Sequence, residues 1–310
     1  MKSSNKLPAI FLLGPTASGK TDWAIKLHQK YQDKLTLISV DSVLVYRDCN
    51  IGANKPSQEV LKKHPHHLID ILDIKEVYNV ASFINDVKKI VRSSAEQDKI
   101  PLLVGGTMMY FHALKSGLNN LPDTDLKIRN ELTKFVEDHG SLALFEELTQ
   151  IDPDAAKKIS PNDTQRLIRA IEIIKSSQDP PRDKGLNPLS DDFNLIEIGI
   201  FPERVDIHHK IHQRQKEIIG DQLIEEVQRL LTKYNPKADH PVCKAINYRQ
   251  VIQMLNGQIS KQEIFDKTLF ATRQFAKRQI TWMRSWNNLY MFSDRDFDGA
   301  NELLKKTINF

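Results

Sequence analysis

The chain has 310 residues, of which 40% are hydrophobic and 27% are charged, and its formal net charge is +4. This composition is ordinary for a folded globular protein and excludes the disordered and fibrous classes. No stretch approaches the roughly 18 apolar residues that a membrane span needs, and the first residues lack the apolar segment of a secretory signal. We therefore expect a cytoplasmic protein with one large or two modest cores and no membrane partner.

Short apolar runs recur four times along the chain, and segments with helical spacing lie between them. The runs are AIFLL (9–13), LTLISV (35–40), IPLLVGG (100–106) and NLIEIGIF (194–201). This alternation is typical of a parallel sheet covered by helices. The sequence therefore predicts an α/β fold.

A phosphate-binding loop follows the first run. GPTASGKT at residues 14–21 fits the GxxxxGK[ST] pattern completely, and the segment after it has the periodicity of a helix. Backbone N–H groups and the helix N-terminus attract phosphate oxygens, Lys20 neutralises charge, and Thr21 is placed to ligate Mg²⁺. The candidate diphosphate- or nucleotide-binding residues are Gly14, Pro15, Thr16, Ala17, Ser18, Gly19, Lys20 and Thr21.

Polar residues also end the next two predicted strands. Asp41 follows the second, in the crevice where open α/β sheets perform chemistry, so it can accept a proton or hold a metal, or simply cap the next helix. The third strand ends in Gly105, Gly106 and Thr107, where a nucleotide hydrolase would typically carry an acidic Mg²⁺ ligand. Glycines and a hydroxyl favour close backbone approach and hydrogen bonding, which argues against plain triphosphate hydrolysis.

The segment from Thr124 to about Ser177 contains only helix-like stretches. Its N-cap candidates are Asp125, Ser141, Asp152 and Asn162. A loop rich in Pro, Asp and Ser at 176–192 leads back to the sheet. We predict a helical insertion domain at 116–193 within a core formed by 1–115 and 194–310.

Six motifs, taken together, carry a resemblance to a known family. They are GPTASGKT, SVDSVLVYRDCNIGANKP, PHHLID, LLVGGTMMYF, DPDAAKKISPNDTQRLIRAIEI and ATRQFAKRQITWMRSW, in this order from residue 14 to residue 286. The chain resembles the tRNA dimethylallyltransferases (tRNA isopentenyltransferases, or IPP transferases), which prenylate the adenosine beside the anticodon. The resemblance implies a P-loop NTPase-like parallel sheet core with an inserted all-helical domain.

The resemblance also implies a reaction. The dimethylallyl group of dimethylallyl diphosphate moves to N6 of adenosine 37 in the tRNA anticodon stem-loop, and the loop at 14–21 holds the departing diphosphate with Mg²⁺ as cofactor. Asp41 would take the proton from the adenine N6 amine, a general-base role. Thr107 would hydrogen-bond the bridging oxygen as the C–O bond breaks. We expect a monomer.

The tRNA contacts that the resemblance implies are spread over the chain. They are Asp41, Ser42, Val43, Leu44, Thr107, Arg129, Gln165, Arg166, Leu167, Ile168, Arg169, Lys244, Ala245, Ile246, Asn247, Tyr248, Arg249, Lys277, Arg278, Gln279, Ile280, Thr281, Trp282, Met283 and Arg284. Independently, residues 268–290 combine four cations and two tryptophans with no acidic residue, which suits a phosphate backbone and an unstacked base. Lys277, Arg278 and Arg284 cannot all share one helical face. A solvated helix with a tryptophan-filled inner stripe is the alternative.

Two departures and three alternative functions stay open. Asn247 stands where relatives usually have Gly, although Asn tolerates left-handed geometry better than most residues. His208 and His212 have metal-ligand spacing on a predicted helix, but no third ligand is apparent. A small-molecule kinase would not need the acid-free basic stretch, and an RNA-binding switch should hydrolyse ATP. A prenyltransferase for free adenylates would lack the long RNA-facing C-terminal part.

Overall fold

The computed structural model describes residues 6–117, 122, 124–176 and 188–308. The chain divides into two compact units, the first formed by 1–116 with 188–310 and the second by 117–187. The second unit lies within the insertion that the sequence predicts at 116–193. Helix α8 (Leu189–Asp192), near the predicted end of that insertion, belongs to the first unit.

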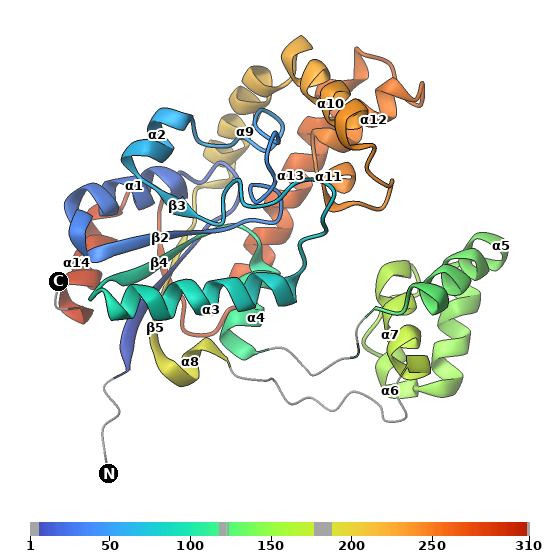
Figure 1. Cartoon of the computed structure of the whole chain (residues 1–310), viewed down its shortest axis with the longest axis horizontal. Coiled ribbons are helices and arrows are strands. Elements are labelled where there is room, and N and C mark those ends of the chain that lie inside the picture. The colour runs from blue at the N-terminus through green and yellow to red at the C-terminus, as the bar shows by residue number, and fades with distance from the viewer. Residues whose placement is uncertain (1–5, 118–121, 123, 177–187, 309–310) are drawn as a thin grey trace. The chain divides into compact units, whose positions relative to one another are not determined.

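A six-stranded parallel sheet forms the centre of the first unit, in the order β3-β2-β4-β1-β5-β6 (Figure 1). The strands are β1 (Leu7–Leu13), β2 (Leu35–Val40), β3 (His66–His67), β4 (Ile100–Gly105), β5 (Phe193–Ile200) and β6 (Tyr290–Phe292). The predicted α/β fold is confirmed, and the four predicted strands correspond to β1, β2, β4 and β5. The edge strands β3 and β6 are too short to show a period of their own.

Helices cover the sheet and extend beyond its carboxyl end. Those of the first unit besides α8 are α1 (Lys20–Lys30), α2 (Gln58–Lys63), α3 (Val80–Glu96), α4 (Met108–Ser116), α9 (Arg204–Ile218), α10 (Asp221–Tyr234), α11 (Pro241–Lys244), α12 (Tyr248–Leu255), α13 (Glu263–Arg284) and α14 (Phe297–Thr307), with the 3₁₀ turn η1 (Gln32–Lys34). No helix in the described part of the chain is long and apolar enough to cross a membrane.

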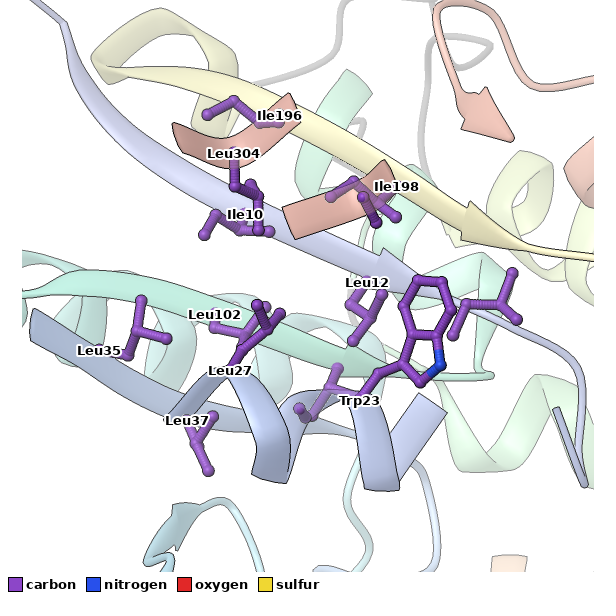
Figure 2. Close-up of a cluster of buried hydrophobic side chains, with 14 of the residues drawn as sticks. Ile10, Leu12, Trp23, Leu27, Leu35, Leu37, Leu102, Ile196, Ile198 and Leu304 are labelled. Carbon is purple, nitrogen blue, oxygen red and sulfur yellow. The ribbon is translucent and has the colours of Figure 1, made fainter. Parts of the chain in front are cut away.

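The core is packed on both faces of β1. Ile10 and Leu12 face a cluster that contains Trp23 and Leu27 of α1 (Figure 2). Phe11, between these two residues, points the other way, and its ring lies 5.1 Å from the ring of Phe111 in α4, measured between centroids. A strand covered on both faces has no solvent side, which is why its sequence is apolar throughout. This packing fixes the strand ends that carry the site.

The second unit contains α5 (Leu126–Ile151), α6 (Pro153–Ala156) and α7 (Thr164–Ser176). The predicted N-caps Asp125 and Asp152 are confirmed, since each accepts hydrogen bonds from N–H groups of the first turn. The predicted N-cap Asn162 is wrong, because the neighbouring Asp163 accepts from Arg166 N instead. The predicted N-cap Ser141 falls one residue late, because the non-helical residue at the kink inside α5 is Gly140, with φ 83° and ψ 166°.

Residues 177–187 of the predicted loop at 176–192 lie outside the described residues. Its last part is helical, because 189–192 form α8.

Candidate active site

The candidate site lies in the first unit, at the carboxyl ends of β1, β2 and β4. Two backbone hydrogen bonds tie these ends together. Gly14 N donates to Gly105 O at 3.3 Å, and Thr107 N donates to Val40 O at 3.4 Å. The residues that follow the three strands, Asp41 among them, are therefore brought to one edge of the sheet, as a parallel sheet requires.

The phosphate loop has the backbone shape of an anion cradle. Gly19 has φ 83° and Ala17 has φ 64°, so the chain turns sharply before α1 begins at Lys20. Among the described residues, no side chain caps the N-terminus of α1. Its first N–H groups are therefore available to an anion, as is the positive end of the helix dipole.

A cavity of about 380 Å³ opens over this loop. Its lining includes Thr16, Ala17, Gly19, Lys20 and Thr21 of the loop, Asp41 and Leu44 after β2, and Arg214 of α9. The cavity thus gathers the phosphate-loop residues and the candidate base in one place, together with a cation from a distant helix.

Two half-buried cations make the cavity suited to an anion. Burial, together with the nearby Arg214 charge, lowers the pKa of Lys20 to about 8, and Asp41 only partly offsets this. Burial also lowers the pKa of Arg214, against the opposing charges of Asp22 and Glu217. Cations held at a cost in a cavity regain that free energy when a polyanion enters.

No motif marks Arg214, but its place on α9 carries a signal. The apolar stripe of that helix runs through Ile207, Ile211 and Ile218, all buried. Arg214 falls on the same face, three residues after Ile211 and four before Ile218. A cation on the buried face of a helix must find a cavity or a partner, and here it faces the phosphate loop.

Asp41 has a structural role as well as a place in the cavity. Its Oδ1 accepts hydrogen bonds from Val43 N at 2.8 Å and Leu44 N at 3.1 Å. No helix follows directly, so the alternative of a helix cap is replaced by a cap on a turn. With Oδ1 committed to the turn, Oδ2 is the oxygen that can accept a proton from a molecule in the cavity.

A second cavity, of about 630 Å³, adjoins the first and shares Thr16, Asp41, Asn54, Arg214 and Phe275 with it. The candidate residues that line it are Asp41, Ser42, Val43, Thr107, Lys244, Ala245, Ile246, Asn247, Tyr248, Arg249 and Arg278. One channel therefore leads from the phosphate loop, past the candidate base and Thr107, to a rim on α11, α12 and α13.

A buried carboxylate on α10 holds one wall of this channel. Glu226 is 2% exposed and accepts from the backbone N–H groups of Asn50, Ile51 and Gly52 at 3.2, 2.8 and 3.1 Å. The Tyr248 hydroxyl donates to the same carboxylate at 2.8 Å, and burial raises the pKa of that hydroxyl, so it stays a donor. The turn that walls both cavities is thereby tied to α10 and α12.

Asn247 holds the same turn from the other side, with φ 75° and ψ −54°. Its Nδ2 donates to Gly52 O at 2.9 Å, and its N–H donates to Gln250 Oε1 at 2.9 Å. Asn247, where the resemblance implies Gly, thus accepts a positive φ and adds a side-chain bond.

We expect Asn247→Ala to lower the free energy of unfolding by about 1 to 3 kcal/mol, because Ala has no side-chain bond and strains at positive φ. Asn247→Gly should be destabilised less, since it removes the bond but not the backbone fit. Urea unfolding of the three proteins measures this order. An Ala variant as stable as the parent would show that the turn does not depend on Asn247.

The remaining candidates lie on α13 and in the second unit. Gln165, Arg166 and Arg169 are on α7 and Arg129 is on α5, where all four reach the surface at least in part. Among these remaining candidates, the apolar side chains that are buried within their own units are Leu167, Ile168 and Met283. They support their helices, so we do not propose that these three side chains touch RNA.

The inner stripe of α13 differs from the one that the solvated-helix alternative predicts. Its buried stripe contains Thr272, Ala276, Gln279 and Met283 but no tryptophan, and Trp282 is 38% exposed. The alternative of a tryptophan-filled inner stripe is therefore wrong. Exposed residues of this segment include Lys277, Arg278, Thr281 and Arg284, and Ile280 is partly buried. Lys277 and Arg284, seven residues apart, share one face, while Arg278 lines the channel.

A channel with a phosphate-binding loop at one end and a carboxylate midway suits the transfer of a group from a phosphorylated donor. The fold and the channel define a phosphate-loop α/β transferase. A family model described as IPP transferase matches residues 44–286. The chain belongs to this family, and the resemblance predicted from the motifs is confirmed.

Named relatives agree with this assignment. The chain is 42% identical over 277 residues to the tRNA dimethylallyltransferase of Vesicomyosocius okutanii subsp. Calyptogena okutanii (strain HA), covering 89% of this chain and 90% of the relative. It is 40% identical over 312 residues to tRNA dimethylallyltransferase 2 of Hahella chejuensis (strain KCTC 2396), covering 95% and 93%.

Solved structures share the fold. The tRNA isopentenylpyrophosphate transferase from Bacillus halodurans matches with a TM-score of 0.70 and 33% identity, over 97% of this chain and 96% of that one. A eukaryotic dimethylallyltransferase acting on tRNA matches with a TM-score of 0.78 and 21% identity, over 96% of this chain and 78% of that one. The predicted fold class, a P-loop-like α/β core, is confirmed by these matches.

Proposed function

We propose that this chain transfers the dimethylallyl group of dimethylallyl diphosphate to N6 of adenosine 37 in tRNA and releases diphosphate. The observation that carries the proposal is the single channel in the first unit. It joins the phosphate loop to Asp41 and Thr107, and these to a rim at 244–249 and Arg278. The names of the relatives support the same reaction.

The donor end of the channel would neutralise the leaving group. An allylic C–O bond breaks readily once the negative charge of the departing diphosphate is compensated. Lys20, Arg214 and the N–H groups at the start of α1 supply that compensation, and one preorganised donor of this kind contributes about 3 to 4 kcal/mol. The Thr107 hydroxyl would donate to the bridging oxygen, which becomes a diphosphate oxygen.

The acceptor end would receive a single base. Adenosine 37 must leave its stack to reach the interior of the channel, as base-modifying enzymes generally require. Its N6 forms a bond to the allylic carbon as the C–O bond breaks, and Asp41 takes the N6 proton. General-base assistance of this kind contributes roughly 10² to 10⁴ in rate.

We propose Mg²⁺ as the cofactor, held by diphosphate oxygens and the Thr21 hydroxyl. Among the residues that the structure describes, no three His, Cys, Asp or Glu side chains form a metal set, and Thr21 lines the phosphate cavity. This donor set fits Mg²⁺, which keeps several waters and binds through substrate phosphates rather than an all-protein cage. When bound, the ion supplies further charge neutralisation to the diphosphate.

The decisive experiment is incubation with dimethylallyl diphosphate and an unmodified tRNA that carries A36-A37-A38, followed by mass analysis. We expect a gain of one C5 prenyl group on tRNA, and none on a control tRNA with G at position 37. Prenylation of free AMP alone would favour the adenylate prenyltransferase, and ATP hydrolysis without prenylation would favour a switch. We propose a monomer as the working unit.

A second measurement tests the RNA face. Replacing Lys277, Arg278 or Arg284 with Gln should weaken tRNA binding similarly for all substrate tRNAs. The plot of log affinity against log salt should become less steep by a little under one unit for each phosphate contact that is removed. The matched control is Lys267→Gln, since Lys267 lies earlier on α13 and pairs with Glu263 at 3.7 Å. An unchanged slope in all three variants would remove this segment from the interface.

A further inference from the structure

One side chain on the buried stripe of α13 is out of place there by its chemistry. Gln279 is 4% exposed, between the apolar neighbours Ala276 and Met283 on the same stripe. An amide carries two donors and an acceptor, and a buried amide is stable only when these find partners. Its partners lie in two other segments of the chain, far away in sequence.

The amide of Gln279 bridges two of the three strand ends that form the site. Its Oε1 accepts from Thr16 N at 2.8 Å, and its Nε2 donates to Gly106 O at 2.7 Å. Thr16 belongs to the phosphate loop after β1, and Gly106 lies after β4, next to Thr107. A single amide thus sets the distance between the diphosphate cradle and the hydroxyl proposed to act on the bridging oxygen.

The fit at this bridge explains the second glycine of LLVGGT. A Cβ on residue 106 would lie 2.4 Å from Gln279 Nε2 and 3.2 Å from Gly14 O. The Gln279 amide therefore packs so closely against the backbone of Gly106 that no side chain fits at position 106. An alanine at 106 would displace the amide from its position.

We propose that Gln279 is a positioning residue that aligns the phosphate loop with the Thr107 segment and couples the diphosphate site to RNA bound on α13. The proposal rests on the proposed function. Arg278 and Lys277 precede Gln279 within the same helical turn, so RNA that holds these cations also holds the amide. The N–H of Thr16 is turned to this amide, so the bridge fixes the first turn of the cradle. A direct RNA contact, expected for Gln279 from the resemblance, is replaced by this internal role.

The test is a thermodynamic cycle with Gln279→Met, which keeps the length and removes both hydrogen bonds. Calorimetry gives the Kd of inorganic diphosphate with Mg²⁺, in the absence and presence of a non-substrate tRNA with G at position 37. In the parent protein we expect RNA to change that Kd at least about fivefold, since coupling between sites typically spans roughly 5- to 150-fold. In Gln279→Met the diphosphate Kd should rise about tenfold, and the effect of RNA should vanish.

Several outcomes would overturn the proposal. A parent protein whose diphosphate Kd is insensitive to RNA removes the coupling, and an unchanged diphosphate Kd in Gln279→Met removes the positioning role. A merely structural role would instead lower the melting temperature and tRNA affinity together with diphosphate affinity. The matched control is Gln228→Met on the exposed side of α10, which should change none of these quantities. Because the cycle reads binding alone, it still gives a result if no prenyl transfer to tRNA is found.

A double variant tests the packing of the two residues directly. Gly106→Ala should lower kcat/KM for dimethylallyl diphosphate in tRNA prenylation at least tenfold, because its Cβ displaces the Gln279 amide. In a Gln279→Ala background the decrease should be much smaller, since the Nε2 atom that would lie 2.4 Å from that Cβ is gone. Two residues in contact give such non-additive effects, and independent residues do not. Additive effects would show that Gly106 acts without Gln279 and would overturn the bridge.

Discussion

Replacing Asp41 with Asn lowers the single-turnover rate of tRNA prenylation by about 10²-fold or more if Asp41 is the general base. The change is well suited to this site, because Asn keeps the Oδ1 acceptor that holds the Val43 and Leu44 N–H groups. The turn therefore survives, and only the basic oxygen is removed. Transfer measured with both substrates saturating reports the chemical step, and tRNA affinity should change much less.

Two controls separate chemistry from architecture. Asp296→Asn makes the same change at a carboxylate whose Oδ1 accepts from Gly299 N at the start of α14, so its rate should match the parent. Asp41→Ala removes the hydrogen bonds that hold the turn as well as the base. The further decrease in its rate, compared with Asp41→Asn, measures how much the rate depends on the turn. A near-parental rate for Asp41→Asn would show that Asp41 only stabilises the turn and is not the general base.

The strands and the phosphate loop could be predicted because their signals are local. The strands β1, β2, β4 and β5 are covered by neighbours, so their sequences are short apolar runs. The loop needs glycine, lysine and a hydroxyl at fixed spacing, and those residues are adjacent in the chain. The strands β3 and β6 are short edge strands, formed only because β2 and β5 are already in place.

The parts of the site that could not be predicted depend on contacts between distant segments. Glu226 looks like a solvated charge on an amphipathic helix, but its donors lie about 175 residues earlier, at Asn50, Ile51 and Gly52. For Arg214, the sequence offers only one signal, its position on the buried face of α9. No local pattern says which backbone groups such side chains will meet.

Small local choices also depend on the folded backbone. Asn162 and Asp163 are adjacent and both belong to the residue types that cap helices. Only the backbone direction before α7 decides that Asp163 accepts from Arg166 N. Similarly, the motif around Gln279 suggests an RNA contact, while the fold turns that side chain inward.

Replacing Lys20 with Ala should lower kcat/KM for dimethylallyl diphosphate by about 10²- to 10³-fold, the usual decrease for one preorganised donor at a developing negative charge. Lys20 lies at the start of α1, and its Nζ is 3.1 Å from Pro15 O inside the phosphate cavity. Since it faces only that cavity, tRNA affinity should stay nearly unchanged. Lys26→Ala is the matched control, because Lys26 lies on the same helix with its Nζ over the Phe297 ring.

The pH dependence of diphosphate binding gives the same residue a second signature. The pKa of Lys20 in the free protein is about 8, lowered by burial and by Arg214 from the usual lysine value of 10.5. Below about pH 8 the ammonium is charged and binding needs no proton. Above it the affinity for dimethylallyl diphosphate should fall up to about tenfold per pH unit, since binding must then take up a proton, while the terminal phosphate of this ester completes its ionisation near pH ~6. The fall should persist in Lys26→Ala and disappear in Lys20→Ala. If the fall persisted in Lys20→Ala, a group other than Lys20 would cause the pH dependence. An equal decrease of tRNA affinity in that variant would contradict a role confined to the diphosphate.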